Sequence, residues 1–348
     1  MNHIELFAGC GGLSLGLKSL GYELVLANEL SPMASETFAY NFFNEDLSSS
    51  GALDKSKVKW LQSNYPANER QKRLREDPRS FPREGKGYTE VSKASDLKGA
   101  LVVGSIIQLN EWLSHNKYAT KQLANSFGNG ELDLVSGGPP CQSFSMAGMR
   151  EFTNSRNTLP WEFAKFVSLT KPKFALLENV TGILRPFNVN GEKVYAWFEV
   201  AKAFAEIGYV PLCLHINAKF SGVAQNRPRF VMLSLRKDIY KKISETFNET
   251  EKALFKSSDF FYQSISKGNI PSYGSLNFFD VKSNDDLFLF KSSFLKYLVE
   301  YSVNPHSVKD AIHDLRSSTA KIKKSTYLES IDSYLGSLLP KRSMSNHE

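Results

Sequence analysis

Short apolar runs alternate with longer amphipathic stretches through the first two thirds of the chain, a pattern that predicts strands separated by helices. The predicted strands are residues 3–7, 23–27, 100–104, 132–136, 174–177, 210–216 and 230–235. The predicted helices are residues 13–20, 33–41, 159–169 and 194–207. Strands that alternate with helices indicate an α/β fold with a doubly wound, mostly parallel sheet.

Two regions break this alternation. Residues 44–98 are polar and contain several prolines, so we interpret them as an insertion. Within residues 70–86, seven basic residues accompany three acidic ones. These basic residues either form a solvated surface or contact a DNA backbone. Residues 237–348 are rich in Ser, Lys and Phe and show few strand patterns, so we predict an accessory C-terminal region after a catalytic domain at residues 1–236.

Composition narrows the class of protein. The 348 residues are 41% hydrophobic and 23% charged, which is ordinary for a soluble globular protein. No apolar stretch approaches the roughly 20 residues that span a bilayer, and the N-terminus lacks the features of a signal peptide. We therefore expect a cytoplasmic protein without a membrane span. The net charge of +7 favours a polyanionic partner such as nucleic acid.

Cysteine spacing argues against a metal site. The cysteines are Cys10, Cys141 and Cys213, and none of them forms a Cys-x-x-Cys pair. Zinc binding and a disulfide framework are therefore not expected, and a free thiol at Cys141 fits a reducing compartment.

The loop that ends in Cys141 is the most informative motif. Two glycines and two prolines, residues 137–140, connect the predicted strand 132–136 to this cysteine. Glycines let the backbone turn sharply or approach a ligand closely, and prolines fix φ and stiffen the loop. We therefore expect a rigidly presented thiol at the carboxyl edge of the sheet, where α/β proteins bind their ligands.

A second motif predicts a cofactor site. Residues 7–12, Phe-Ala-Gly-Cys-Gly-Gly, lie between the first predicted strand and helix, where glycines allow a ligand to approach a helix N-terminus. Glu29 ends the next strand, where Rossmann-type sites hold ribose hydroxyls. Because the chain has no Gly-x-Gly-x-x-Gly and no P-loop lysine, a cofactor without a pyrophosphate fits better, and S-adenosylmethionine is the first candidate. The alternative is an ordinary strand–helix turn with a surface glutamate.

Two further positions are candidates for chemistry. Glu178 directly follows the apolar run 174–177, so partial desolvation suits its carboxyl group to act as an acid. Arg227 and Arg229 precede the strand 230–235 and point the same way, so they could bind a carboxylate, a phosphate or a base carbonyl. The alternatives are a capping or surface glutamate and arginines that face solvent.

Together these motifs resemble the DNA cytosine-5 methyltransferase family over residues 3–236. The matching segments are residues 7–12, Glu29, and residues 137–145, 178–180 and 225–229, in the family's order, with a weaker likeness at 308–312. The resemblance implies a Rossmann-like, S-adenosyl-L-methionine-dependent methyltransferase fold. It also implies methylation of cytosine C5 in double-stranded DNA, in a restriction–modification or phage-defence setting.

The resemblance assigns the catalytic roles. Cys141 would add to C6 of cytosine, and this covalent intermediate would make C5 nucleophilic. Glu178 would protonate or hydrogen-bond N3 of the ring. Arg229 would contact the cytosine carbonyl and steady Glu178, and Arg227 would support the loop and the thiolate. Because a stacked base cannot reach this thiol, the cytosine would flip out of the duplex.

The resemblance also implies the cofactor contacts, which are Phe7, Gly9, Gly11, Gly12, Glu29, Ser105, Ile106 and Pro140. Phe7 would flank the adenine, and Glu29 would hold the ribose hydroxyls. Gly9 and Gly11 would approach the methionine part, with Pro140 close to it. Ser105 departs from the pattern, because the family commonly has an aspartate there, and a hydroxyl would bind the adenine amino group less strongly than a carboxylate.

The C-terminal region departs further from the family. The target-recognition segment and the closing Gly-Asn helix are not recognisable in residues 237–348. We hypothesise that the chain is the larger part of a split methyltransferase, and that a second polypeptide supplies target recognition and the closing helix. Two other functions stay open: a transfer-RNA cytosine-5 methyltransferase, since one branch of the family uses the same residues, and a non-catalytic DNA-binding subunit.

Overall fold

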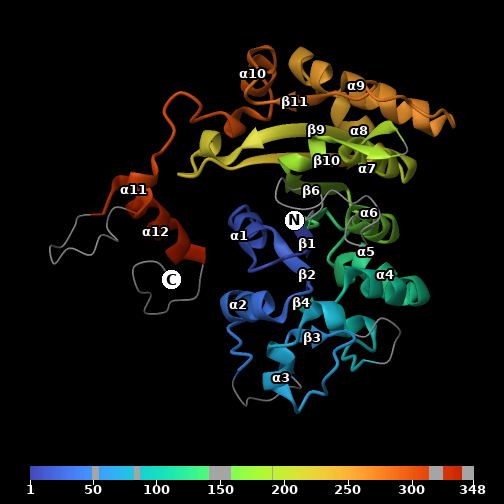
Figure 1. The fold of residues 1–348 in the computed structure, drawn as a ribbon, viewed down its shortest axis with the longest axis vertical. Helices are drawn as coiled ribbons and strands as arrows, with labels where there is room; N and C mark the ends of the chain where they lie inside the picture. Colours follow the sequence, from blue (N-terminus) through green and yellow to red (C-terminus); the bar gives the residue numbers. More distant parts are fainter. Residues whose placement is uncertain (49–54, 82–86, 141–157, 190, 313–323, 339–348) are drawn as a thin grey trace. The chain divides into compact units, whose positions relative to one another are not determined.

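The computed structural model describes residues 1–48, 55–81, 87–140, 158–189, 191–312 and 324–338 (Figure 1). The described residues form two compact units. Unit 1 comprises residues 1–140 and 158–177, and unit 2 begins at residue 178 and continues to residue 337. The boundary falls inside strand β6 (Phe174–Val180). The sequence predicts a boundary at residue 236 between a catalytic domain and an accessory region. That boundary concerns function, and it stays a prediction.

Parallel strands form the sheet of unit 1, in the order β6-β5-β1-β2-β4-β3. The strands are β1 (Asn2–Leu6), β2 (Glu23–Glu29), β3 (Val58–Trp60), β4 (Ala100–Val103) and β5 (Leu134–Gly137). The chain adds β2 on one side of β1 and β5 on the other. The predicted parallel, doubly wound sheet is therefore confirmed, and its topological switch point lies between β1 and β5, where α/β sheets bind ligands.

Helices connect these strands, and capping residues fix where several of them begin. They are α1 (Gly12–Ser19), α2 (Pro32–Phe43), α3 (Arg70–Leu74), α4 (Ile106–His115), α5 (Lys117–Ala124) and α6 (Leu159–Thr170). Ser31, Ser105 and Asn116 each accept a hydrogen bond from a backbone N–H in the first turn of α2, α4 and α5. The sequence pattern had predicted no helix in residues 106–124, where the structure has α4 and α5.

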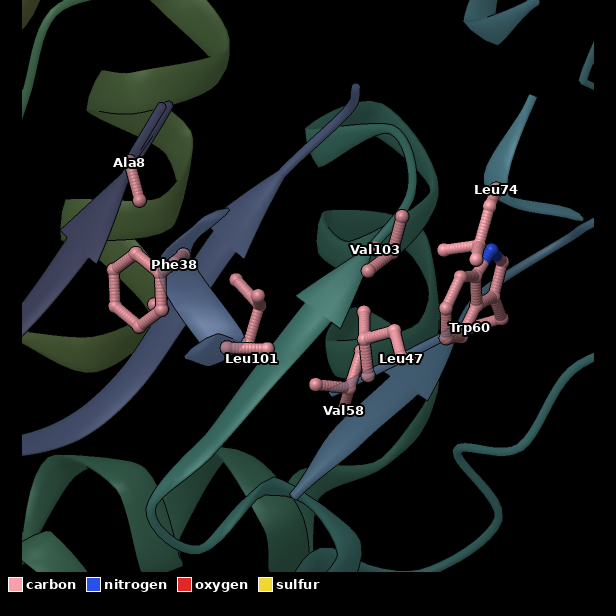
Figure 2. Packing of buried hydrophobic residues seen from close by; sticks show 10 residues of the cluster. Ala8, Phe38, Leu47, Val58, Trp60, Leu74, Leu101 and Val103 are labelled. Atoms are coloured by element: carbon pink, nitrogen blue, oxygen red, sulfur yellow. The ribbon is translucent and has the colours of Figure 1, made fainter. Parts of the chain in front are cut away.

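The polar segment 44–98 contributes to the core of unit 1. Its strand β3 pairs in parallel with β4 at the edge of the sheet. The side chains of this segment join those of α2 and β4 in one apolar cluster (Figure 2). The cluster includes Phe38, Leu47, Val58, Trp60, Leu74, Leu101 and Val103. The segment therefore extends the α/β sheet as well as interrupting the sequence pattern.

Four basic residues of this segment pair with acids. The Arg73 side chain is only 2% exposed, donates to Glu90 at 2.6 Å and lies over the ring of Trp60. The other pairs within 4.0 Å are Lys72–Glu69, Arg75–Glu36 and Arg79–Asp77. For the buried Arg73 the pairing favours a structural role. The side chains of Lys72, Arg75 and Arg79 are 63%, 65% and 75% exposed, so their pairs are weak and both interpretations of these residues stay open.

Unit 2 is built on the antiparallel pair β9 (Tyr209–Asn217) and β10 (Pro228–Arg236), and β11 (Phe278–Asp280) adds to β9 in parallel. Strands β7 (Pro186–Val189) and β8 (Glu192–Tyr195) form a separate hairpin. The helices are α7 (Ala196–Glu206), α8 (Lys237–Ser244), α9 (Glu249–Ser266), α10 (Asn284–Lys291), α11 (Val308–Ile312) and α12 (Thr326–Leu338). The helix predicted from residue 194 starts later because its first residues belong to β8. In the described parts of the chain, every helix is too short or too polar to cross a membrane.

Candidate active site

The glycine-rich loop between β1 and α1 has an unusual backbone. Phe7, Gly9 and Gly11 all have positive φ, at 56°, 55° and 90°. A phenylalanine in this region is uncommon, and such strain tends to occur at ligand sites. A Cβ on Gly11 would lie 2.4 Å from the ring of Phe42, so packing against α2 requires glycine there. At Gly9 and Gly12 no atom of the described residues lies within 4 Å of the added Cβ, so this part of the structure leaves room for a ligand at the loop.

Glu29 is held in place at the end of β2. Its Oε2 accepts from the backbone N–H of Gly9 at 2.8 Å, and its Oε1 accepts from that of Ser31 at 2.8 Å. Each carboxylate oxygen can accept a further hydrogen bond, so ribose hydroxyls could donate to a fixed acceptor. Open space at Gly9 beside a fixed carboxylate fits an adenosine-containing cofactor.

Ser105 and Ile106 lie at the start of α4, after β4. The hydroxyl oxygen of Ser105 accepts from the N–H of Ile107 at 3.3 Å and so caps the helix. Ile106 is 3% exposed, so its side chain belongs to the core and a cofactor contact would come from its backbone. The sequence reasoning missed Asn28, whose Nδ2 donates to the carbonyl oxygens of Val102 and Gly104, both at 3.0 Å. In the sequence, only its position directly before Glu29 pointed to a role for Asn28.

The structure follows the cysteine loop as far as Pro140. Gly137 faces β1, and a Cβ there would lie 2.5 Å from the carbonyl oxygen of Leu6. The close approach that this glycine permits is therefore to a neighbouring strand. Pro139 is buried and Pro140 is exposed at the carboxyl edge of unit 1. The next residue, Cys141, lies outside the described residues.

A buried acid next to the glycine-rich loop was also missed. Glu5 on β1 is 3% exposed and accepts hydrogen bonds from the backbone N–H and the hydroxyl of Ser14 in α1. Burial raises the pKa of Glu5 to about 7, and the negative charge of Glu29 adds to the rise. A charged residue inside an apolar run was the sequence signal.

In unit 2 the structure brings two predicted residues together. Arg229 on β10 donates from Nε to Oε1 of Glu178 at 2.6 Å, and from Nη1 to the carbonyl oxygen of Pro228 at 2.8 Å. The two side chains are 19% and 35% exposed, so the pair is partly shielded yet open to a ligand. Glu178 lies within β6 rather than after a strand. A guanidinium that fixes one carboxylate oxygen leaves the other for a substrate group.

Arg227 is placed differently. It precedes β10, and its side chain is exposed. Its backbone N–H donates to Oδ1 of the buried Asn217 at 3.1 Å. The structure thus brings Arg229, and not Arg227, to Glu178.

A model of the C-5 cytosine-specific DNA methylase family matches residues 1–66 and 110–331. The chain belongs to this family. It is 29% identical to the Type II methyltransferase M.DdeI of Desulfomicrobium norvegicum over 238 residues, which are 68% of this chain and 41% of that protein. It is 30% identical to the Type II methyltransferase M1.HphI of Haemophilus parahaemolyticus over 241 residues, 68% of this chain and 46% of that protein.

The chain thus spans less than half the length of these two relatives. Among solved structures, the Dnmt2 methyltransferase of S. pombe matches with a TM-score of 0.37 and 16% sequence identity. That match covers 72% of this chain and 56% of the other.

Proposed function

We propose that the protein transfers a methyl group from S-adenosyl-L-methionine to C5 of cytosine in double-stranded DNA, in a restriction–modification setting. The observation that carries the proposal is the Arg229–Glu178 ion pair at 2.6 Å, in a family member that has a Pro-Pro-Cys-Gln motif at residues 139–142. The two relatives named above are Type II methyltransferases, which supports the setting.

The cofactor would be held by unit 1. Glu29 would accept from the ribose hydroxyls, the open backbone at Gly9 would face the methionine part, and Phe7 would flank the adenine. Gly104 and Ser105 would meet the adenine edge. When bound, S-adenosylmethionine supplies an electrophilic methyl group.

Covalent catalysis would make cytosine reactive. The Cys141 thiolate would form a bond to C6, and the electron pair displaced from the ring double bond would make C5 nucleophilic. Glu178, with one oxygen engaged by Arg229, would donate a proton from the other to N3 and so neutralise the negative charge that develops there. C5 would take up the methyl group that the cofactor supplies, and a base would then remove the C5 proton. Loss of that proton would break the C6–sulfur bond, return the N3 proton to Glu178, and restore both the aromatic ring and the thiolate.

Transfer of a labelled methyl group tests the proposal. Duplex DNA and transfer RNA are each incubated with the protein and methyl-labelled S-adenosylmethionine, and the nucleosides are analysed. Label at C5 of cytosine in the DNA is the expected result. Label in transfer RNA alone would support the RNA methyltransferase instead, and DNA binding without transfer would support a non-catalytic subunit.

Target recognition by a second polypeptide is a further part of the proposal. The same assay is run on the isolated chain and on the chain with any polypeptide that co-purifies from its native host. We expect weak transfer from the chain alone and sequence-specific transfer with the partner. Strong, sequence-specific transfer by the isolated chain would contradict the need for a partner.

Replacing the carboxyl group of Glu178 should slow methyl transfer. Glu178→Gln keeps the shape of the side chain but loses the acid, so we expect kcat to fall about a hundredfold while the affinity for cofactor is retained. Glu199→Gln is the matched control, because Glu199 is also 35% exposed and pairs with Lys202 at 2.8 Å on α7. Equal turnover rates for the two variants would contradict the role of Glu178.

A further inference from the structure

The loop after β4 is held in place by a buried side chain. Asn28 is 2% exposed and lies at the end of β2, the strand next to β4. Its two amide hydrogens go to the carbonyl oxygens of Val102 and Gly104, both at 3.0 Å. The backbone N–H of Gly104 donates in turn to the carbonyl oxygen of Glu29 at 2.9 Å. The loop is thereby fastened to the same short segment that carries the candidate ribose acceptor.

The segment after β3 supports this loop from the other side. The backbone N–H of Leu61 donates to the carbonyl oxygen of Val103 at 2.8 Å. A Cβ on Gly104 would lie 2.6 Å from the carbonyl oxygen of Leu61, so the two backbones are in close contact. Val58 and Trp60 hold β3 against Leu101 and Val103 in the apolar cluster (Figure 2). The loop therefore has a fixed neighbour on each side.

The fixed position of the loop after β4 is important because the side chain of Ser105 has little hydrogen-bonding capacity left for a ligand. Its hydroxyl already accepts from the N–H of Ile107, and it stands where the family commonly has a carboxylate. A single shared hydroxyl binds an amino group less strongly than a carboxylate does. The affinity for the adenine end of the cofactor then depends on backbone groups that are already in position before the cofactor binds.

We propose that Asn28 is a positioning residue that holds the backbone of Gly104 and Ser105 in place for the adenine of the cofactor. Residues 58–61 serve as the outer support of the same loop. Asn28 acts through these residues, because both of its amide hydrogens are already donated to the protein. The inference rests on the proposed function, since it takes S-adenosylmethionine as the cofactor.

The test compares two asparagines that each bridge neighbouring segments of the unit 1 sheet. Asn28→Ala removes the bridge at the carboxyl edge. Asn2→Ala is the matched control, because Asn2 accepts from Asp133 N–H at 2.9 Å and donates to the carbonyl oxygen of Glu131 at 3.3 Å, at the opposite edge. Titration calorimetry gives the affinity of each protein for S-adenosylhomocysteine. It also gives the affinity for S-inosylhomocysteine, which lacks the adenine amino group.

We expect Asn28→Ala to weaken binding of S-adenosylhomocysteine about tenfold and binding of the inosyl analogue by less, so that discrimination between the two is lost. Asn2→Ala should bind both as the wild type does. If Asn28→Ala weakens both analogues equally, or binds like Asn2→Ala, the inference is wrong and the proposed function stands. If the wild type binds neither analogue, both the inference and the proposed function are wrong.

Two further measurements cover the case in which Asn28→Ala does not fold. Asn28→Leu keeps the approximate shape of the side chain without adding a charge, lacks the amide donors and should show the same loss of discrimination. Hydrogen exchange of the wild type gives an answer without any variant. We expect residues 100–108 to exchange slowly already before S-adenosylhomocysteine is added. Protection that appears only after the addition would contradict a loop positioned in advance.

Discussion

Replacing Cys141 by alanine should abolish covalent capture of duplex DNA that carries 5-fluorocytosine in place of cytosine. In the proposed mechanism, the thiolate of the wild-type protein would add to C6 and the methyl group would be transferred, but fluorine at C5 could not leave as a proton does. Elimination is then blocked, and the protein stays bound to DNA through sulfur. Without the sulfur no such bond forms, so we also expect methyl transfer to unmodified DNA to fall on the order of 10⁴-fold or more.

Denaturing electrophoresis measures the capture, since only a covalent adduct survives it. Cys213→Ala is the control. Cys213 on β9 is 0% exposed, and burial raises the pKa of its thiol, so it is a poor nucleophile. This variant should capture DNA as the wild type does. Capture by Cys141→Ala at the wild-type level would overturn covalent catalysis by this residue, whatever the methyl-transfer assay shows.

The sequence pattern predicted those parts of the fold and site that depend on local order. Apolar runs with glycine near their ends predicted β1, β2, β4 and β5, because a buried parallel strand is apolar at most positions of both faces. The order of these strands then placed the loop at residues 7–12 and Pro140 at the carboxyl edge of one sheet. The family resemblance, and not the local pattern, implied the pairing of Arg229 with Glu178, which are 51 residues apart.

Other features depend on contacts that no local pattern encodes. Strand β3 has three residues, too few to show a period, and it lies among polar residues because it is an edge strand. Asn28 finds its partners 74 and 76 residues away, so its role exists only in the folded sheet. Glu5 interrupts an apolar run, and only the structure shows that Ser14 satisfies its carboxyl group.

Two buried titratable residues on β1 should make opposite contributions to the pH dependence of the protein's stability. Burial lowers the pKa of His3 from 6.5 to about 4, and burial raises that of Glu5 from 4.5 to about 7. Between pH 6.5 and 4 the unfolded chain takes up a proton at His3 and the folded chain does not, so stability falls as pH falls. Between pH 4.5 and 7 the unfolded chain releases a proton from Glu5 that the folded chain keeps, so stability falls as pH rises.

Because these slopes oppose each other, the two contributions largely cancel between pH 4.5 and 6.5 in the wild type, and single substitutions should reveal them. Each contribution amounts to about 3 kcal/mol across its window. Glu5→Gln keeps an acceptor for Ser14 and removes the titration, so its stability relative to the wild type should rise by about 3 kcal/mol from pH 4.5 to 7. His3→Phe, which suits a ring packed edge-on against Tyr22, should gain a similar amount as pH falls from 6.5 to 4.

Urea unfolding of the cofactor-free protein at a series of pH values measures both effects. Glu23→Gln is the control, because Glu23 is exposed at the start of β2. The change with pH for Glu5→Gln should exceed that for this exposed carboxyl group. A constant offset for Glu5→Gln across the range would show that the folded protein holds this carboxyl group charged. Glu5 would then link α1 to β1 as an ordinary carboxylate. The stability would not fall with rising pH on its account, and nothing would oppose the contribution of His3.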